Sequence, residues 1–529
     1  MKQTFSKILK DIFVKRSYLI IPVFQFLLSF CTDRYIFATL TKETIIYYVF
    51  DKIVYLLVLV LIWHYLFLAI RGRKENGFKY RMLKYSILFG CIYALCVLCI
   101  YPMIEFGGDM PFFESAAREY RLDGGLHWIT TLVWILGYMM FPCEGGPTII
   151  MTLLSITAHG YICAKMDDMN INRIFRILFL LPPIIMYSLY PTRMTTMTIV
   201  YMVYFTILYT DYSKGEELNN KKLWILLLFT GMLSAWRMEG VYLLVFAPLF
   251  LILAYRQRFK LKLYLKYFVC IFIMNIILSI PSPEVSLADK VHPIVGYMIP
   301  LMEMSGVDLE ECEEYSILNQ YVDMELVKEK EEGMGLELYR ADYLEALEAF
   351  REDPSVTKEE YVWAAVKMCL KNPFKYLETR LKVFAITNAS SFPFTGSKYL
   401  NEEGKIESKR EIMLYILNDY KSAFLDIKMD NGWTVLWRTV VNWTKNFTWQ
   451  LWTTLIMMIW LIRDTVKRKD WFVFWYTMGM WIYAAIVFLF SPGAIFKYYL
   501  PQYTYAILIV IFYLSRKKLE ESKEYECKR

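Results

Sequence analysis

The sequence lacks three patterns that would each point to a familiar class of protein. Its ten Cys residues are scattered, with neither the spacing of metal ligands nor the pairing of a disulfide framework. No internal repeat is detectable, whereas many transporters consist of two related halves. No small-residue cleavage site follows the first apolar run, so we expect no removable signal peptide. These absences disfavour metal-binding, disulfide-rich and two-halved transport proteins.

Apolar side chains are abundant instead. Of the 529 residues, 57% are apolar and 17% are aromatic, and the mean hydropathy is +0.33. A soluble globular protein of this length does not normally reach such values. The sequence therefore predicts an all-α polytopic membrane protein.

Apolar runs of roughly 17–25 residues predict the membrane spans. They lie at residues 18–40, 44–70, 85–103, 127–142, 146–165, 174–191, 195–211, 223–236, 240–255, 266–281, 447–463 and 471–491, and 500–515 is a thirteenth candidate. The run 127–142 is the shortest, and we interpret it as an interfacial or re-entrant helix. About twelve crossings remain.

The distribution of Lys and Arg predicts the orientation. With both termini inside, the cytoplasmic segments hold 32 Lys and Arg residues. The short outer loops contain only Arg34, Lys42, Arg118, Arg121, Arg193, Arg237 and Lys497. Because Lys and Arg are retained on the cytoplasmic side, this asymmetry favours cytoplasmic termini. The net charge of +7 then reflects this bias and implies no nucleic-acid partner.

The chain divides into three parts. Residues 1–281 form an N-terminal transmembrane domain with its first large outer loop at 104–126, and residues 447–529 form the C-terminal spans and a cytoplasmic tail. Between them, residues 282–446 carry 29 Asp and Glu against 19 Lys and Arg. Apolar residues recur at helical spacing there, and Thr357 with Glu360 forms a capping box. We expect a helical extracytoplasmic domain. The sequence does not decide whether Cys312 and Cys369 form a disulfide there.

Asp109 stands in an unusual place, between Gly107-Gly108 and Pro111 at the outer end of the third predicted span. One interpretation is a helix N-cap, since Asp accepts from free backbone N–H groups and Pro suits the first turn. The other is a general base that takes a proton from an acceptor hydroxyl. Glu114 and Arg118, four residues apart, could pair with each other.

Basic residues are rare on the predicted outer side, yet several map to tight turns there. Arg118, Arg193, Arg237 and Lys497 all lie near outer span ends. Each one alone could anchor the chain to lipid headgroups. Together with Asp109 they predict a site for a phosphate whose negative charge grows during a reaction.

Two of these turns carry a resemblance. Arg237-Met-Glu239-Gly240 between two spans, the late Lys497-Tyr498-Tyr-Leu-Pro501 and the acid at 109 resemble the GT-C superfamily of integral-membrane glycosyltransferases, over roughly 85–255 and 447–515. The resemblance implies transfer of a sugar from a polyprenyl-phosphate donor to an extracytoplasmic acceptor, which would be a cell-envelope glycan, a lipid or a protein. The location would be the bacterial cytoplasmic (inner) membrane, with the active site facing outside.

The resemblance also assigns roles to residues. Asp109 would be the catalytic base, and Arg118, Arg193, Arg237 and Lys497 would bind the donor phosphate. We expect Glu114, His127, Glu239 and Tyr498 to contact substrate. The chain departs from the commonest pattern because Met110, and no second acid, follows Asp109. Whether a divalent metal assists is therefore left open.

Two other classes compete with this hypothesis. An O-antigen-type polymerase or ligase would share the large outer segment, and a transporter or lipid flippase would share the number of spans. Ionisable groups at mid-membrane depth would favour transport. The acidic pair Asp167-Asp168 falls on the predicted cytoplasmic side, away from the proposed site.

Overall fold

The structure, a computed structural model, describes most of the membrane region and part of the segment 282–446. The described residues are 17–99, 110–122, 127–189, 193–280, 291, 295, 299–304, 306–327, 349–351, 354–387, 448–491 and 496–527.

Within these residues every regular element is a helix, and the only β pairing is an isolated bridge between Val322 and Phe350. The first part of the chain forms α2 (Ser17–Ile36), α3 (Ile45–Arg71), α4 (Phe78–Cys99), α5 (Met110–Arg118), α6 (Trp128–Met140), α7 (Gly146–Asp168), η1 (Arg173–Leu180), α8 (Pro182–Leu189), α9 (Arg193–Lys214), α10 (Asn220–Trp236), η2 (Met238–Val241), α11 (Tyr242–Ala254) and α12 (Leu261–Ser279). The rest forms α14 (Ile299–Met304), α15 (Glu313–Tyr321), α18 (Lys358–Lys371), α19 (Pro373–Thr387), α22 (Leu451–Arg468), α23 (Trp471–Phe490), η6 (Phe496–Tyr499) and α24 (Leu500–Cys527).

The predicted all-α membrane protein is confirmed at this level. Five described helices are long and apolar enough to cross a membrane, namely α3, α7, α12, α23 and the part of α2 from Leu19 to Ile36. Most other predicted spans coincide with helices that are shorter, less apolar or more charged, namely α4, α9, α10, α11, α22 and α24.

The predicted span 174–191 differs from expectation. It is divided into the 3₁₀ helix η1 and the short helix α8, and the division falls at Leu181-Pro182-Pro183. Proline has no N–H to donate, and its ring disfavours helical geometry in the residue before it. Two adjacent prolines therefore end η1, and α8 starts anew.

Helix α6 is a short apolar helix. Its 13 residues extend about 20 Å, less than the ~30 Å hydrocarbon core. At its start, the indole of Trp128 donates to the carbonyl of Leu278 near the end of α12 at 2.6 Å. At its other end, the Met139 carbonyl accepts from Tyr55 of α3 at 3.1 Å. Helix α6 thus connects two distant parts of the bundle.

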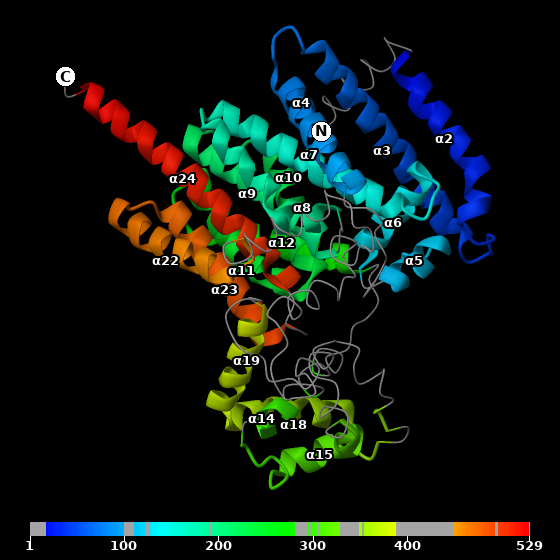
Figure 1. Ribbon diagram of the computed structural model, residues 1–529, viewed down its shortest axis with the longest axis vertical. Helices are drawn as coiled ribbons and strands as arrows, with labels where there is room; N and C mark the ends of the chain where they lie inside the picture. Colours follow the sequence, from blue (N-terminus) through cyan, green and yellow to red (C-terminus); the bar gives the residue numbers. More distant parts are fainter. Residues whose placement is uncertain are drawn as a thin grey trace.

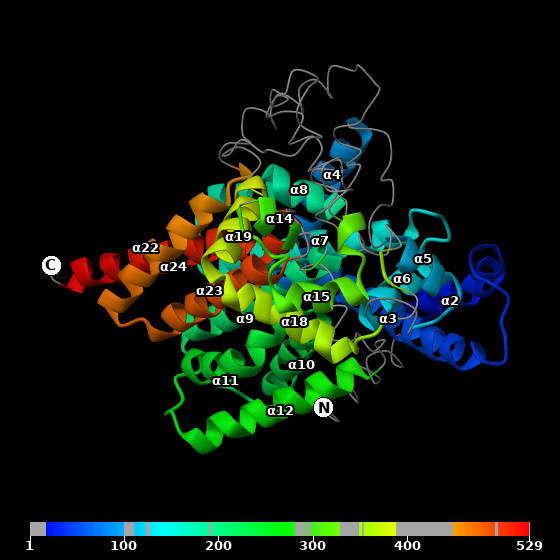
Figure 2. The same ribbon diagram turned by 90° about the horizontal axis from the view of Figure 1, so that it is seen from below.

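Helices at the centre of the bundle pack closely, whereas those at its edge expose apolar side chains. At Gly160 of α7 an added Cβ would lie 2.6 Å from the Met82 carbonyl of α4, so only glycine permits this approach. Helices α2 and α3 lie at one edge in two views (Figures 1 and 2) and bury few of their apolar residues. Their outward faces, such as Ile46 at 74% exposure, suit lipid rather than water.

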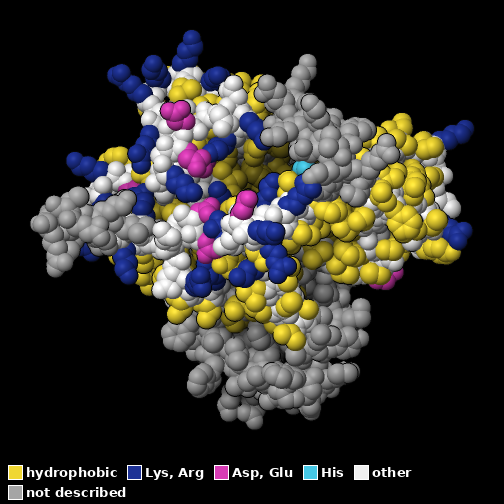
Figure 3. Space-filling model, turned by 90° about the horizontal axis from the view of Figure 1, so that it is seen from above, with side chains coloured by type: hydrophobic (Ala, Val, Ile, Leu, Met, Phe, Trp, Pro, Cys, Tyr) yellow, Lys and Arg dark blue, Asp and Glu magenta, His cyan; other side chains and the backbone are white. Residues whose placement is uncertain are grey.

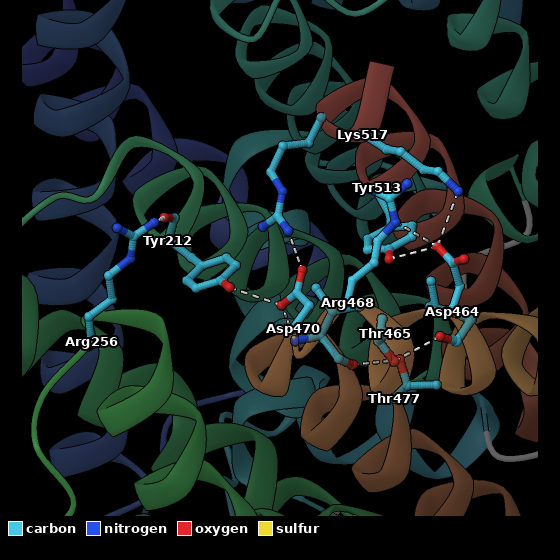
Figure 4. Close-up of polar contacts among 12 residues, drawn as sticks. Tyr212, Arg256, Asp464, Thr465, Arg468, Asp470, Thr477, Tyr513 and Lys517 are labelled. Atoms are coloured by element: carbon cyan, nitrogen blue, oxygen red, sulfur yellow. Dashed lines mark hydrogen bonds and ion pairs between the residues drawn. The ribbon is translucent and has the colours of Figure 1, made fainter. Parts of the chain in front are cut away.

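Ion pairs hold one end of α22, α23 and α24 together (Figure 4). Asp470, which is buried, caps α23 by accepting from the Val473 N–H, and it also accepts from Tyr212 at 2.9 Å and from Arg516. Nearby, Asp464 accepts from Tyr513 at 2.9 Å. This network holds the N-terminal end of α23 in place. Because α23 runs from there to the opposite end of the bundle, the network also sets the orientation of the helix.

We expect Asp470→Ala to lower the free energy of unfolding by about 3 kcal/mol, since it leaves the partly buried Arg516 without its buried carboxylate partner and removes a helix cap. Asp464→Ala is the matched control, because its carboxylate is partly exposed and such pairs contribute at most about 1 kcal/mol. Unfolding of the purified protein by detergent titration measures both. Equal effects would contradict the structural role of Asp470.

The described part of the segment 282–446 forms a small helical domain, here called the insertion, which projects from one end of the bundle (Figure 1). Its core is formed by α15 and α18, with Tyr321 stacked on Tyr361 at 4.4 Å. The predicted capping box of Thr357 and Glu360 is confirmed. Helix α18 ends at Lys371, and α19 begins at Pro373. Cys312 and Cys369 are both free thiols. Recurring apolar residues also predict a helix over 336–350, but most of these residues lie outside the described part of the chain.

Candidate functional site

The tight turn between α10 and α11 holds a buried ion pair. Arg237 ends α10 in an extended conformation and donates twice to Glu239, from Nε at 2.9 Å and from Nη2 at 2.8 Å. The side chains are 10% and 5% exposed. Burial opposes ionisation of Glu239, but the charge and hydrogen bonds of Arg237 hold its pKa below the usual range. The pair is charged, and the Nη1 group of Arg237 takes no part in it.

Gly240 makes this turn possible. A Cβ at this position would lie 2.0 Å from the carbonyl of Leu233 in α10, so any side chain would push the turn away from the helix. The Arg-x-Glu-Gly sequence therefore has a steric reason for its glycine and an electrostatic reason for its two charges.

A second turn, η6 at the start of α24, brings further groups to the same place. The guanidinium of Arg237 lies 5.5 Å from the centroid of the Tyr498 ring, and Nζ of Lys497 lies 5.1 Å from the same centroid. The two cations are thus within about 11 Å of each other. Tyr483 of α23 fixes the turn by donating to the Tyr498 carbonyl at 2.9 Å. Lys497 is buried, at 8% exposure.

His127 and Arg193 complete the group. The imidazole of His127 stacks on Trp236, the residue before Arg237, at 6.0 Å. Burial and the charge of Arg193 lower the pKa of His127 to about 4, so the ring is neutral at pH 7. Its Nδ1 accepts from the Ile129 N–H at 3.3 Å, which places the proton on Nε2. That Nε2 is buried and has no hydrogen-bond partner among the described residues.

Arg118 and Glu114 lie elsewhere. Arg118 pairs with Glu114 at 2.9 Å and Glu144 at 2.5 Å, and donates to the Ile36 carbonyl at 3.2 Å. Its guanidinium lies 5.2 Å from the ring centroid of Tyr138, near the end of α6. His127 precedes Tyr138 by eleven residues, which corresponds to about 16 Å along α6. Of the predicted residues, the structure brings together Arg193, Arg237, Glu239, His127, Lys497 and Tyr498.

Asp109, the predicted base, lies outside the described residues. The helix expected after it is present as α5, which begins at Met110 with Pro111 in its first turn. Helix α5 packs against α6, whose first residues adjoin the Arg237 group.

The insertion is joined to the same end of the bundle. Arg380 of α19, only 1% exposed, caps the last turn of α23 by donating to the Phe488 carbonyl and, at 2.7 Å, to the Ser491 hydroxyl. Tyr376 donates to the Leu489 carbonyl at 2.6 Å. These are the free carbonyls at a helix C-terminus, where a cation is favoured. Six residues after Ser491 comes Lys497.

Sequence reasoning did not find Tyr483, Trp236 or Arg380. Tyr483 and Trp236 lie among many aromatic residues of apolar runs, so nothing local distinguishes them. Arg380 lies in α19, and its partners are more than a hundred residues away. An arginine inside an otherwise apolar face was the available signal.

The assembled group could bind an anion. It has three cations, one carboxylate and a neutral imidazole N–H, which lie in turns or at the starts of helices. Among the described residues no group of three or more His, Cys, Asp or Glu side chains is close enough to hold a metal ion. No known protein family, curated protein or solved structure matches the chain.

Proposed function

We propose that the chain is an integral-membrane glycosyltransferase that moves a sugar from a polyprenyl-phosphate donor to an acceptor outside the bacterial cytoplasmic membrane. The observation that carries this proposal is the buried Arg237–Glu239 pair beside Lys497, Arg193 and His127. A lipid phosphate is an anion that reaches the end of a membrane helix with its chain still in the bilayer. Cations held there by tight turns suit it.

The chemistry assigned to these residues is a single displacement. A hydroxyl oxygen of the acceptor attacks the anomeric carbon of the sugar, and its proton passes to the carboxylate of Asp109. The bond from that carbon to the phosphate oxygen breaks, and its electron pair leaves with the polyprenyl phosphate. Arg237, Lys497 and Arg193 stabilise the charge that the phosphate gains, and His127 Nε2 donates a hydrogen bond. Tyr498 and Glu239 keep the cations in place.

The proposed topology has about twelve crossings and both termini in the cytoplasm. It counts η1 and α8 together as one bent crossing and counts α6 as none. Figure 3 supports this orientation, since Lys and Arg gather on the face opposite the insertion, where the α3–α4 turn lies in Figure 1. The ends carrying Arg237 and Lys497 then face outside.

We further propose that the insertion selects the acceptor and excludes water from the sugar phosphate. Its α19 is attached to α23 through Arg380, and Phe384 packs on Tyr499 of η6 at 5.5 Å. The insertion therefore contacts the turn that holds Lys497 and Tyr498. Membrane lipids, the donor lipid and a glycan, lipid or protein acceptor are the expected partners.

A transporter remains the second candidate because of three charged residues in α2 and α3. Lys52 pairs with Asp33 at 2.6 Å, and both are buried. Asp51 is 0% exposed, and neither carboxylate oxygen has a hydrogen-bond partner among the described residues. Ionisable groups inside spans are typical of transport paths. These two helices lie at the edge of the bundle, however, which favours a role in joining α2 to α3 (Figure 2).

The test is reconstitution of the purified protein in liposomes with a panel of radiolabelled polyprenyl-phosphate sugars. Transfer, or slow donor hydrolysis without acceptor, is the expected result. An O-antigen-type polymerase or ligase would instead consume a diphosphate-linked oligosaccharide. Movement of a labelled lipid or ion across the bilayer, with no donor consumed, would contradict the proposal and favour the transporter.

Replacing residues 306–371 with a short flexible linker tests the role of the insertion, because this retains α19 and its contacts with α23. We expect transfer to fall at least tenfold while donor hydrolysis stays constant or rises, since water then reaches the sugar phosphate. Release of free sugar and formation of product are measured separately. Loss of both activities in a correctly inserted protein would mean that the removed residues supply catalytic groups.

A further inference from the structure

A polar cavity of about 420 Å³ lies at the start of α4 and the end of α7, near the α3–α4 turn and at the end of the bundle opposite the insertion (Figure 1). It is lined by Arg81 and Lys84 of α4, by Arg173 of η1 and by Asp167, and the amides Asn76 and Asn170 contribute from turns. Asn76 belongs to the α3–α4 turn at the top of Figure 1, and Figure 3 views the molecule from that side. The cavity plays no part in the proposed sugar transfer.

The acids at this cavity are already neutralised. Asp167 accepts from Arg176 and, at 2.8 Å, from Tyr85, whereas Asp168 pairs with Arg81. The acidic pair of the sequence therefore offers no free carboxylate for a cation.

The remaining charge is positive. Lys84 and Arg173 line the cavity, are exposed, and form no ion pair among the described residues. Arg81 uses Nη2 for Asp168, and its buried Nε has no hydrogen-bond partner in the described part of the chain. Three cationic side chains thus have donors that no acceptor among the described residues occupies. An anion with several oxygen acceptors would satisfy them.

Exposed apolar side chains follow the cationic lining residues closely in sequence. On η1, Ile174 and Ile177 are 65% and 62% exposed, directly after Arg173. On α4, Ile87 is 58% exposed and lies about one turn after Lys84. Exposed isoleucines beside exposed cations mark the boundary between the headgroup and acyl regions of a bilayer.

We propose that this cavity binds the phosphate of an anionic phospholipid headgroup, held by Lys84, Arg173 and Arg81, with the acyl chains lying along Ile174, Ile177 and Ile87. A free phosphate has the same oxygen acceptors but makes no use of the isoleucines. A zwitterionic lipid would bring its own cation toward Lys84 and Arg173. The apolar border and the net positive charge therefore favour an anionic lipid.

Lipid binding to the purified full-length protein in neutral detergent, measured by native mass spectrometry, tests this proposal. Phosphatidylglycerol and phosphatidylcholine with the same acyl chains are titrated separately, and inorganic phosphate and glycerol phosphate are added as competitors. The Lys84→Gln, Arg173→Gln double variant removes two exposed charges and no ion pair among the described residues. The Lys221→Gln, Arg258→Gln variant is the matched control, since both residues are exposed on the same predicted face.

We expect phosphatidylglycerol to bind more tightly than phosphatidylcholine, and the double variant to weaken its binding about 30-fold, at about fivefold for each charge. The control variant should change it less than threefold. Equal affinity for the two lipids, or equal loss in both variants, would overturn the proposal. Competition by glycerol phosphate with an affinity equal to that of the lipid would show a site for a soluble anion and would overturn the assignment to lipid.

Discussion

Replacing Asp109 with Asn is expected to reduce sugar transfer by about 10²–10⁴-fold, with unchanged amounts of folded protein in the membrane. The carboxamide has the same shape and can accept a backbone N–H as a helix N-cap does, but it cannot take a proton from an acceptor hydroxyl. The turnover of the reconstituted protein at saturating donor measures the loss.

Asp123→Asn provides the control, because Asp123 is another aspartate of the same predicted outer loop, 104–126. It should keep nearly full activity. If Asp109→Asn also keeps most of its activity, Asp109 is a helix cap and the base is a different group.

Removing the charges of Arg237 and Lys497 is expected to lower kcat/KM for the donor about 10–100-fold each, as for loss of a hydrogen bond to a charged group. The acceptor KM should change little. Arg237→Gln alone would leave Glu239 buried without its partner and destabilise the turn. The informative variants are therefore Lys497→Gln and the double variant Arg237→Gln, Glu239→Gln, in which both charges of the pair are removed.

Arg118→Gln is the comparison for these variants. Arg118 was predicted to bind the donor phosphate as well, but it contacts Glu114 and Glu144. We expect Arg118→Gln to lower kcat/KM for the donor by less than about threefold. A loss as large as that at Lys497 would place Arg118 in the donor site, and equal losses for donor and acceptor at Lys497 would indicate a membrane anchor.

The helices could be predicted from the sequence because their signals are local. Apolar runs placed α3, α7 and α23 closely, and Thr357 with Glu360 marked the start of α18. The division of 174–191 was also visible in Pro182-Pro183, but hydropathy averages over a window and hides a local break. Continuous apolar character did not guarantee a continuous helix.

The candidate site could be predicted only in part. Arg237 and Glu239 were found because both charges lie in one short turn, and their pairing needs no distant element. The contact of that turn with Tyr498 joins residues about 260 positions apart, and only their shared predicted side of the membrane suggested it. Arg118 lies on that side too, yet neighbouring carboxylates engage it. Membrane topology predicts how deep in the membrane a residue lies. Which residues of that depth come together depends on how the helices pack around the bundle.

Because Arg380 caps the last turn of α23 and Phe384 packs on Tyr499, the insertion cannot shift without disturbing the turn that carries Lys497. A ligand held by the insertion and a ligand held by Lys497 would then influence each other through one rigid connection. Thermodynamic linkage makes this influence reciprocal: if the acceptor tightens donor binding by some factor, the donor tightens acceptor binding by the same factor. If the proposed function holds, this linkage would keep the donor weakly bound until an acceptor arrives, and a cell would lose few activated sugars to water.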